Sequence, residues 1–354
     1  MHGQLFRRKL VIDQGCKRGG LHTGGETLSQ QYGGIHARGW VDRLPASWVP
    51  YIQLSRLSPP AALLLIYFPH LFGVAHAASV YRRPLRQVAY VSLVLLGGSF
   101  FCNNASHAWN DLVDASIDRL VSRTKTRPIP RGAITRRAAF LFTITQALGA
   151  AAFLLFLPKD TAIATVPNIV ATTYYPYAKR HTHLPQIVLG FCLSWGILVG
   201  SSALGVDAPW RDPAILYLFV ASLSWVVIFD TIYAHQDVDD DRRHGVKSMA
   251  VLLQGRAKPL LLSLCLCMSL SLLLSGYLAH MGILYFVITV GVSTWSVVTM
   301  VVKVDLKDPV SCWLWFSQGF LLAGFAIVSG LLLECAGQGW IPVSIRRNPF
   351  IESI

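Results

Sequence analysis

Residues 88–118 read VAYVSLVLLGGSFFCNNASHAWNDLVDASID, an apolar run of membrane-spanning length that ends in three aspartates. The apolar part, residues 88–109, predicts a transmembrane helix, because a helix needs about 20 apolar residues to cross the hydrocarbon core of a bilayer. Asp111, Asp114 and Asp118 are spaced three and four residues apart, so a helix continuing through them places their carboxylates on one face. The stretch therefore predicts a long helix with an acidic cluster at its end.

The remainder of the chain has the same apolar character. Of 354 residues, 53% are hydrophobic and only 14% are charged, a composition typical of a protein whose main solvent is lipid. We therefore expect an all-α integral membrane protein with about nine transmembrane helices in a single bundle. The predicted spans are 61–80, 88–109, 138–158, 160–177, 184–204, 213–233, 258–280, 281–303 and 312–334.

Positive charge is distributed unevenly between the two ends of this predicted bundle. The amino-terminal segment and the loops after the second, fourth, sixth and eighth spans hold 24 of the 31 lysines and arginines. Because cytoplasmic loops carry an excess of Lys and Arg, the amino terminus and the loops at 110–137 and 234–257 are predicted on the cytosolic or matrix-like side. The net charge of +13 retains these loops at an anionic leaflet, or attracts an anionic substrate.

The domain organisation follows from these spans. Residues 1–53 are basic and Gly-rich and contain no apolar core of a secretory signal, and their acidic residues disfavour a mitochondrial transit peptide. We expect a disordered tail at 1–53, a transmembrane domain at 54–335 and a short tail at 336–354.

Cysteines and histidines give no sign of a soft metal site. The seven cysteines form no CxxC pair, which disfavours a zinc site and a disulfide framework. His70, His76, His107 and His235 have no ligand-like spacing with the cysteines, so packing is the expected role of each.

A second acidic cluster lies in FDTIYAHQDVDDDRRHGVKS, residues 229–248. Asp237 and Asp241 are four residues apart and Asp230 is seven before Asp237, so these acids also follow one helical face. Gathered carboxylates repel one another, and a hard divalent cation relieves that repulsion: Mg²⁺ binds carboxylate oxygens and completes its shell with water and phosphate oxygens. Two such clusters at one end of a bundle predict a metal and diphosphate site.

Basic residues follow both clusters. Arg123, Lys125, Arg127 and Arg131 come after the first, and Lys247 comes after the second. They are placed to bind phosphate charge that the metal does not neutralise. Ordinary positive charge in a cytosolic loop remains the alternative for any one of them.

These motifs resemble those of a known family. Asn110-Asp111-x-x-Asp114-x-x-x-Asp118 resembles the NDxxDxxxD motif of the UbiA-type membrane prenyltransferases, and Asp237-x-x-x-Asp241 resembles their second, DxxxD motif. RTKTRPIPRG at 123–132 and YPYAKRHTHLPQ at 175–186 are similar to the 4-hydroxybenzoate polyprenyltransferase branch, with Tyr175 and Lys179 on its YxxxK pattern. The resemblance covers residues 54 to 335.

The resemblance implies a helical bundle with a lateral, lipid-facing cavity, in which Mg²⁺ assists transfer of an isoprenyl group from its diphosphate to an acceptor. It implies catalytic roles for Asp111, Asp114, Asp118, Asp237 and Asp241, and a metal-binding set of these five and Asn110. The expected diphosphate-binding residues are Asn110, Lys125, Arg127, Lys179 and Lys247, and the expected acceptor-binding residues are Arg56 and Tyr175. Trp109, Tyr174 and Tyr233 are candidates for shielding the allylic cation, with packing as the alternative.

The start of the first span bears on the acceptor. In SRLSPPAALLLIYFPHLFG, residues 55–73, Ser58 stands where the 4-hydroxybenzoate branch has an acidic residue, and Pro60-Ala61 replaces its usual pair. The stretch looks more like fungal enzymes that farnesylate polyketide-derived phenolic acids in meroterpenoid biosynthesis, and Arg56 is placed to bind such an acid.

The predicted function is thus Mg²⁺-dependent farnesyl transfer from farnesyl diphosphate to a phenolic acid in the endoplasmic reticulum or another intracellular membrane. The alternative is a 4-hydroxybenzoate polyprenyltransferase of ubiquinone biosynthesis in the mitochondrial inner membrane. A transporter is a third alternative, disfavoured because the acids gather at one end rather than at the midplane. The bilayer is an expected partner and nucleic acid is not.

Overall fold

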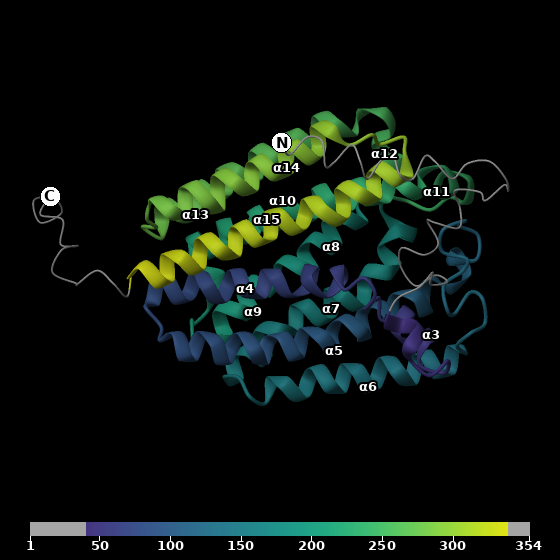
Figure 1. The fold of residues 1–354 in the computed structure, drawn as a ribbon, viewed down its shortest axis with the longest axis horizontal. Helices are drawn as coiled ribbons and strands as arrows, with labels where there is room; N and C mark the ends of the chain where they lie inside the picture. Colours follow the sequence, from purple (N-terminus) through teal and green to yellow (C-terminus); the bar gives the residue numbers. More distant parts are fainter. Residues whose placement is uncertain (1–39, 339–354) are drawn as a thin grey trace, which may run out of the picture.

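The computed structural model describes residues 40–338, which fold into helices with no strand among them (Figure 1). Long helices run side by side in one bundle, as the sequence predicts. The predictions made for residues 1–39 and 339–354 lie outside the described residues.

The helices follow in this order along the described chain. They are η1 (Trp40–Arg43), α3 (Val49–Leu54), α4 (Ala61–Tyr81), α5 (Leu85–Asp118), α6 (Arg136–Leu154), α7 (Lys159–His181), α8 (Pro185–Ser194), α9 (Gly196–Ala203), η2 (Pro209–Arg211), α10 (Pro213–Ala234), η3 (His235–Asp237), α11 (Val238–His244), α12 (Met249–Leu253), η4 (Gln254–Arg256), α13 (Ala257–Leu278), η5 (Tyr285–Val292), α14 (Ser293–Lys303) and α15 (Pro309–Gln338).

Eight stretches of the described residues are long and apolar enough to cross a bilayer, one fewer than the nine predicted spans. The predicted span that is not among these eight is the fourth, 160–177, which corresponds to α7; this helix has 23 residues but is less apolar than the others. Its polar residues have a structural reason, because Asn168, Thr172, Tyr175 and Lys179 line an internal cavity. The all-α membrane architecture is confirmed, and α7 departs from the apolar pattern because one face of it is lined with polar groups.

The predicted boundaries of the transmembrane domain differ from the observed helices at both ends. The boundary at residue 54 falls inside α3, where Leu54 is fully buried and the Tyr51 ring lies 5.2 Å from that of Phe142 on α6. Residues 40–53, assigned to the tail, therefore include folded structure that packs on the bundle. At the other end α15 continues to Gln338.

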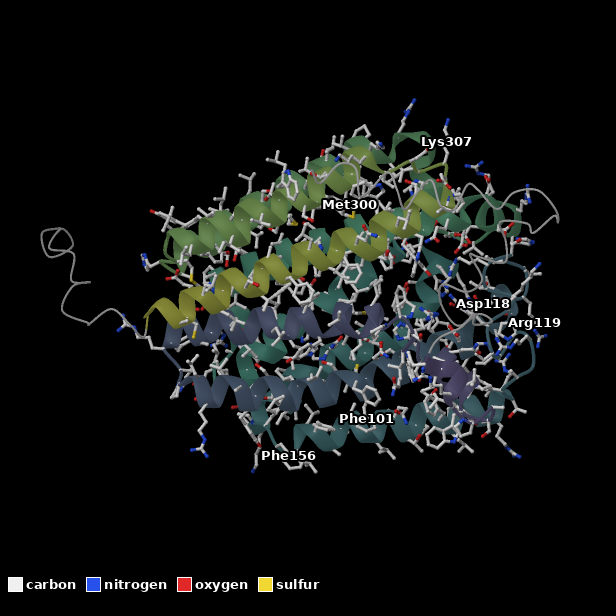
Figure 2. All side chains as sticks on the ribbon, in the orientation of Figure 1. Phe101, Asp118, Arg119, Phe156, Met300 and Lys307 are labelled. Carbon is white, nitrogen blue, oxygen red and sulfur yellow. The ribbon has the colours of Figure 1, made fainter. Side chains whose placement is uncertain are left out.

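The two ends of the bundle differ chemically. In Figure 2, Asp118, Arg119 and Lys307 lie at one end and Phe156 lies at the other. Figure 1 places α3, α11 and α12 at the same end as Asp118. This end carries both acidic motifs and the basic loop after α5, which the charge distribution predicts on one side of the membrane.

Aromatic side chains fill the centre of the bundle. Trp225 on α10 is fully buried, with ring centroids 5.8 Å from Phe72 on α4 and 5.2 Å from Phe229. Phe229 in turn lies 5.8 Å from Phe320 on α15. This core fixes α4, α10 and α15 around the cavity described below.

Helices α4 and α9 approach so closely that Gly73 has no room for a side chain. A Cβ atom at this position would overlap the carbonyl oxygen of Ile197, and backbone atoms cannot move aside cheaply. Gly73→Ala is therefore expected to lower the free energy of unfolding by on the order of 2 kcal/mol, measured as thermal unfolding in detergent. Gly98→Ala is the matched control, because its Cβ would lie an ordinary 3.5 Å from Phe153. Equal melting temperatures for the two variants would contradict the close approach.

Candidate active site

A cavity of 250 Å³ lies within the bundle at the end that carries Asp118. Side chains from α4, α5, α7, α8, α10 and α15 line it. Its inner wall is largely apolar and includes Leu65, Leu189, Leu193 and Phe316. Its outer part is charged, with carboxylates of both acidic motifs and cations of the loop after α5. A molecule with an apolar body and a charged head matches this division.

The first acidic motif is held by a bridging arginine. Arg127 Nη1 donates to Asp111 Oδ1 at 3.1 Å and to Asp118 Oδ2 at 2.9 Å. Arg56 Nη2 donates to the same Asp111 oxygen at 2.9 Å. All three aspartates of the motif are buried, because α5 continues through them as a helix, as the spacing predicts. Buried carboxylates require such partners.

The remaining aspartate of this motif, Asp114, contacts α7 instead. Lys179 Nζ donates to Asp114 Oδ2, and Arg180 lies 3.8 Å from the other oxygen. Tyr175 lies one helical turn before Lys179, and both line the cavity. The YxxxK pattern therefore places a phenol and an ammonium on one face of α7, beside the first motif.

The second motif lies where α10 gives way to η3 and α11. Arg123 Nε donates to Asp237 Oδ1 at 2.9 Å, and its Nη2 donates to Oδ2 at 2.5 Å, a bidentate pair. Arg123 Nη1 also donates to the Tyr233 hydroxyl at 2.8 Å, and the guanidinium lies 5.0 Å from that ring centroid. The Ser122 amide donates to Asp240 at 2.8 Å. The loop after α5 thus joins the two motifs.

The electrostatics of the loop arginines follow from these contacts. Burial lowers the pKa of Arg127, but the attraction of Asp118 and Asp111 outweighs it, so the pKa lies above the ordinary value. Burial likewise lowers the pKa of Arg123, but the attraction of Asp237 outweighs it, so this pKa also lies above the ordinary value. Both guanidinium groups remain charged, and they lie at the mouth of the cavity.

The aspartates of the two motifs are the kind of ligand that Mg²⁺ binds, but they are not gathered into a metal-binding cluster in this structure. Among residues 40–338, no three His, Cys, Asp or Glu side chains gather closely enough to form a metal site. The reason is visible in the pairing, since Arg127, Arg123 and Lys179 separate the carboxylates. Yet Asp111 Oδ2 and Asp114 Oδ1 are buried without a hydrogen-bond partner in the described chain. Hard oxygen donors of this kind are ligands for Mg²⁺.

Most of the predicted site residues share the cavity. The lining includes Arg56, Asn110, Asp118, Arg127, Tyr175, Lys179, Asp237, Asp241 and Lys247. Asp111 and Asp114 lie behind this surface, in contact with Arg56, Arg127 and Lys179. The structure does not place Lys125 in the lining, because its side chain is exposed at the loop surface.

Two other predicted roles also change. Arg131 donates to Gln53 Oε1 and to the Thr126 carbonyl, both at 2.5 Å, and so braces α3 against the loop. Of the three candidate aromatic shields, only Tyr233 lines the cavity. Trp109 donates its indole N–H to the Thr173 carbonyl at 3.0 Å, and Tyr174 is exposed, so their alternative packing roles apply.

Several polar residues that line the cavity have no catalytic, diphosphate-binding, acceptor-binding or metal-binding role predicted from the sequence. These are His70, His107, Asn168, Thr172, Gln186 and Asp230. The sequence already places Asp230 on the helical face of the second acidic motif, and His107, four residues before Asp111, continues the face of the first, which indicates more than the packing role expected for it. The other four have no such register and become visible only when the helices are assembled.

An all-helical bundle of membrane-spanning helices, with a charged mouth and an apolar interior, is the architecture of a membrane protein with an internal site suited to an amphiphilic molecule. The UbiA prenyltransferase family matches residues 66–326. The chain belongs to this family and is a multi-pass membrane prenyltransferase that acts on aromatic acceptors.

Curated relatives fall into two groups. The chain is 35% identical over 266 residues to the prenyltransferase ascA of Acremonium egyptiacum, covering 75% of this chain and 79% of that protein. It is 34% identical to the DMOA farnesyltransferase nvfB of Aspergillus novofumigatus, covering 74% and 83%. It is also 30% identical to the mitochondrial 4-hydroxybenzoate polyprenyltransferase of Schizosaccharomyces pombe, covering 86% and 85%.

Solved structures show the same fold. A UbiA homolog from Aeropyrum pernix K1 in its apo form aligns with a TM-score of 0.61 at 23% identity, covering 76% of this chain and 97% of that one. A UbiA homolog from Archaeoglobus fulgidus, bound to DMAPP and Mg²⁺, aligns with a TM-score of 0.57 at 19% identity, covering 79% and 99%.

Proposed function

We propose that this chain transfers a farnesyl group from farnesyl diphosphate to a ring carbon of a polyketide-derived phenolic acid. The observation that carries the proposal is a cavity in which a charged mouth meets an apolar interior, with Arg56 in its lining. The farnesyltransferase among the relatives supports a farnesyl chain as the transferred group. Ser58 and Pro60-Ala61, which differ from the 4-hydroxybenzoate branch at the start of the first span, support a different phenolic acid as the acceptor.

The charged mouth is suited to a diphosphate. Lys179, Lys247, Arg123 and Arg127 line it, and guanidinium and ammonium groups bind phosphate oxygens through charge-assisted hydrogen bonds. Bound Mg²⁺ would be held by Asn110, Asp111, Asp114, Asp118, Asp237 and Asp241, and it supplies neutralisation of the phosphate charge. Several of these carboxylates currently pair with the same cations, so diphosphate and metal together would redistribute existing pairs.

The reaction breaks the bond between the allylic carbon and the diphosphate oxygen, and the electron pair leaves with the diphosphate. Arg123, Arg127 and Lys179 stabilise that developing charge electrostatically. A ring carbon of the phenol attacks the allylic carbon, and loss of the ring proton restores aromaticity. The Tyr233 ring faces the cavity and can shield the allylic cation, while apolar side chains such as Leu189 and Phe316 exclude water.

The acceptor is positioned by Arg56. Its guanidinium lines the cavity and already binds one carboxylate, that of Asp111, at 2.9 Å. A substrate carboxylate would be recognised by the same donor group, and Tyr175 would form part of that acceptor region. Membranes of the endoplasmic reticulum are the proposed location.

The second candidate is a 4-hydroxybenzoate polyprenyltransferase, which the Schizosaccharomyces pombe relative favours because it covers 86% of this chain. The location would then be the mitochondrial inner membrane. Its acceptor also carries a carboxylate and a phenol, so Arg56 serves either candidate.

Membranes containing the expressed chain are expected to farnesylate an orsellinic-type acid when supplied with Mg²⁺ and farnesyl diphosphate, with the product identified by mass spectrometry. Chelation of divalent metal by EDTA should remove the activity, and added Mg²⁺ should restore it, because the carboxylates need a cation to accept a diphosphate. Turnover of 4-hydroxybenzoate with longer diphosphates, and none of the orsellinic-type acid, would contradict the proposal in favour of the second candidate.

A further inference from the structure

We propose that His70 and His107 are specificity-determining residues of this reaction, in which each imidazole accepts a hydrogen bond from one of the two hydroxyl groups of an orsellinic-type, dihydroxybenzoic acid. This inference rests on the proposed function and sharpens it. It distinguishes a resorcylic-type acid, with two phenolic hydroxyls, from 4-hydroxybenzoate, with one.

Both histidines line the same cavity and both are tied to their own helix in the same way. His107 Nδ1 lies 2.8 Å from the Asn103 carbonyl oxygen, and His70 Nδ1 lies 2.9 Å from that of Ile66. A carbonyl oxygen only accepts hydrogen bonds, so each Nδ1 must carry the proton. Burial within the bundle disfavours a charged imidazolium, so each ring is neutral. Nε2 of each ring is then a pure acceptor.

Neither Nε2 atom has a hydrogen-bond donor among the described residues. The contacts of His70 and His107 in residues 40–338 are made through Nδ1. Two other polar groups of the same lining are satisfied within the chain: Thr172 donates to Asn168 at 3.1 Å, and Gln186 Oε1 accepts from the Met249 amide at 3.1 Å. The two imidazoles are therefore acceptors left for a ligand. Both rings line the cavity, so a phenolic hydroxyl of a bound substrate can supply the donor that Nε2 lacks.

The two rings lie at similar depths on neighbouring helices. Helix α4 begins at Ala61 and α5 ends at Asp118, both at the charged end of the bundle (Figure 1). At a rise of about 1.5 Å per residue, His70 lies about 14 Å and His107 about 16 Å from that end along its helix. Helices α4 and α5 pack against each other. An aromatic ring between them can therefore meet both acceptors.

The carboxylate-binding group lies next to this pair. Asp111, which binds Arg56, is four residues after His107 and so one turn nearer the charged end on the same face of α5. The cavity thus has the guanidinium of Arg56 toward its charged end and two hydrogen-bond acceptors, the Nε2 atoms of His70 and His107, deeper in the bundle. A dihydroxybenzoic acid supplies the matching carboxylate and two donors.

The test compares the dihydroxy acid with its two mono-O-methyl ethers and with 4-hydroxybenzoate, on wild type and on His70→Leu, His70→Gln, His107→Leu and His107→Gln. Wild type is expected to lose roughly 10-fold in kcat/KM for each blocked hydroxyl, the size of one hydrogen bond. Each Leu variant should abolish the discrimination against one ether only. Each Gln variant should retain part of it, because its amide oxygen still accepts a hydrogen bond. A Leu variant with no turnover of any acceptor is resolved by its Gln partner.

His244→Leu is the matched control. His244 has the same contact, Nδ1 at 2.9 Å from the Asp240 carbonyl, but its side chain is exposed and outside the cavity lining. It should leave the discrimination unchanged. If wild type turns over the dihydroxy acid while the His70 and His107 variants discriminate as wild type does, the inference is wrong and the proposed function stands. If wild type prenylates no phenolic acid, both are wrong.

Discussion

Asp237→Asn is expected to lower kcat on the order of 1,000-fold, because Asp237 would help to hold the Mg²⁺ that neutralises the charge developing on the leaving diphosphate. Asp237 lines the cavity, lies opposite the first motif and is bound in a bidentate pair by Arg123. Asparagine keeps the shape but removes the charge, so the loss reports the anion itself. Initial rates in membranes at saturating farnesyl diphosphate measure the change.

The same helical turn supplies the control for this variant. Asp239 is exposed and does not line the cavity, so Asp239→Asn removes an identical charge two residues away and should retain near-normal turnover. Asp237→Asn should also lower the melting temperature, because buried Arg123 loses its charged partner, so the two variants are compared as rates per folded protein below both unfolding transitions. Comparable rates for the two variants would remove Asp237 from the catalytic set.

The sequence predicts the bundle because membrane-spanning length and apolar composition are local properties. All nine predicted spans correspond to helices, and the continuation of α5 to Asp118 follows from the three-and-four spacing of its aspartates. The exception is α7, which is less apolar than the other spans because polar residues on one of its faces line the cavity. The fold of residues 40–53 could not be predicted, because Tyr51 and Leu54 are held by contacts with residues distant in sequence.

The sequence predicted most of the residues that form the candidate site, but not which of their charged side chains form ion pairs. The sequence grouped acids with acids and bases with bases, whereas the structure alternates them: Arg127 lies between Asp111 and Asp118, and Arg123 covers Asp237. Such pairing depends on how the loop after α5 folds back across the helix ends. The same fold-back explains why Lys125 faces away while its neighbours in sequence face inward. The side chains of an irregular loop follow no regular period, so the sequence could not predict which of them face the cavity.

Arg127→Met is expected to destabilise the protein strongly. Removal of one partner from a buried ion pair costs about 3–5 kcal/mol, because the remaining charge stays buried without compensation. Arg127 is 5% exposed and is the shared partner of Asp111 and Asp118, so its loss leaves two carboxylates facing a smaller positive charge. The melting temperature in detergent without divalent metal should fall on the order of 10 °C. Arg119→Met, at an exposed neighbouring position (Figure 2), should leave it unchanged.

The same variant tests the metal assignment without any measurement of turnover. In wild type the Arg127 guanidinium already neutralises part of the negative charge of Asp111 and Asp118, so these carboxylates attract Mg²⁺ less strongly. In Arg127→Met the two carboxylates have lost that counter-charge, and a cation that binds only the folded state raises its stability by mass action. Titration of Mg²⁺ should therefore raise the melting temperature of Arg127→Met more than that of wild type.

A second substitution separates this effect from a general response to salt. Asp118→Asn combined with Arg127→Met removes one of the two freed carboxylates, so the additional Mg²⁺ response should shrink toward the wild-type value. NaCl at matched ionic strength should not reproduce the response, because monovalent ions only screen the charges. An equal Mg²⁺ response in wild type and in both variants would mean that Arg127 and the metal do not share these carboxylates, and Asp111 and Asp118 would then serve to hold the arginine rather than the cation.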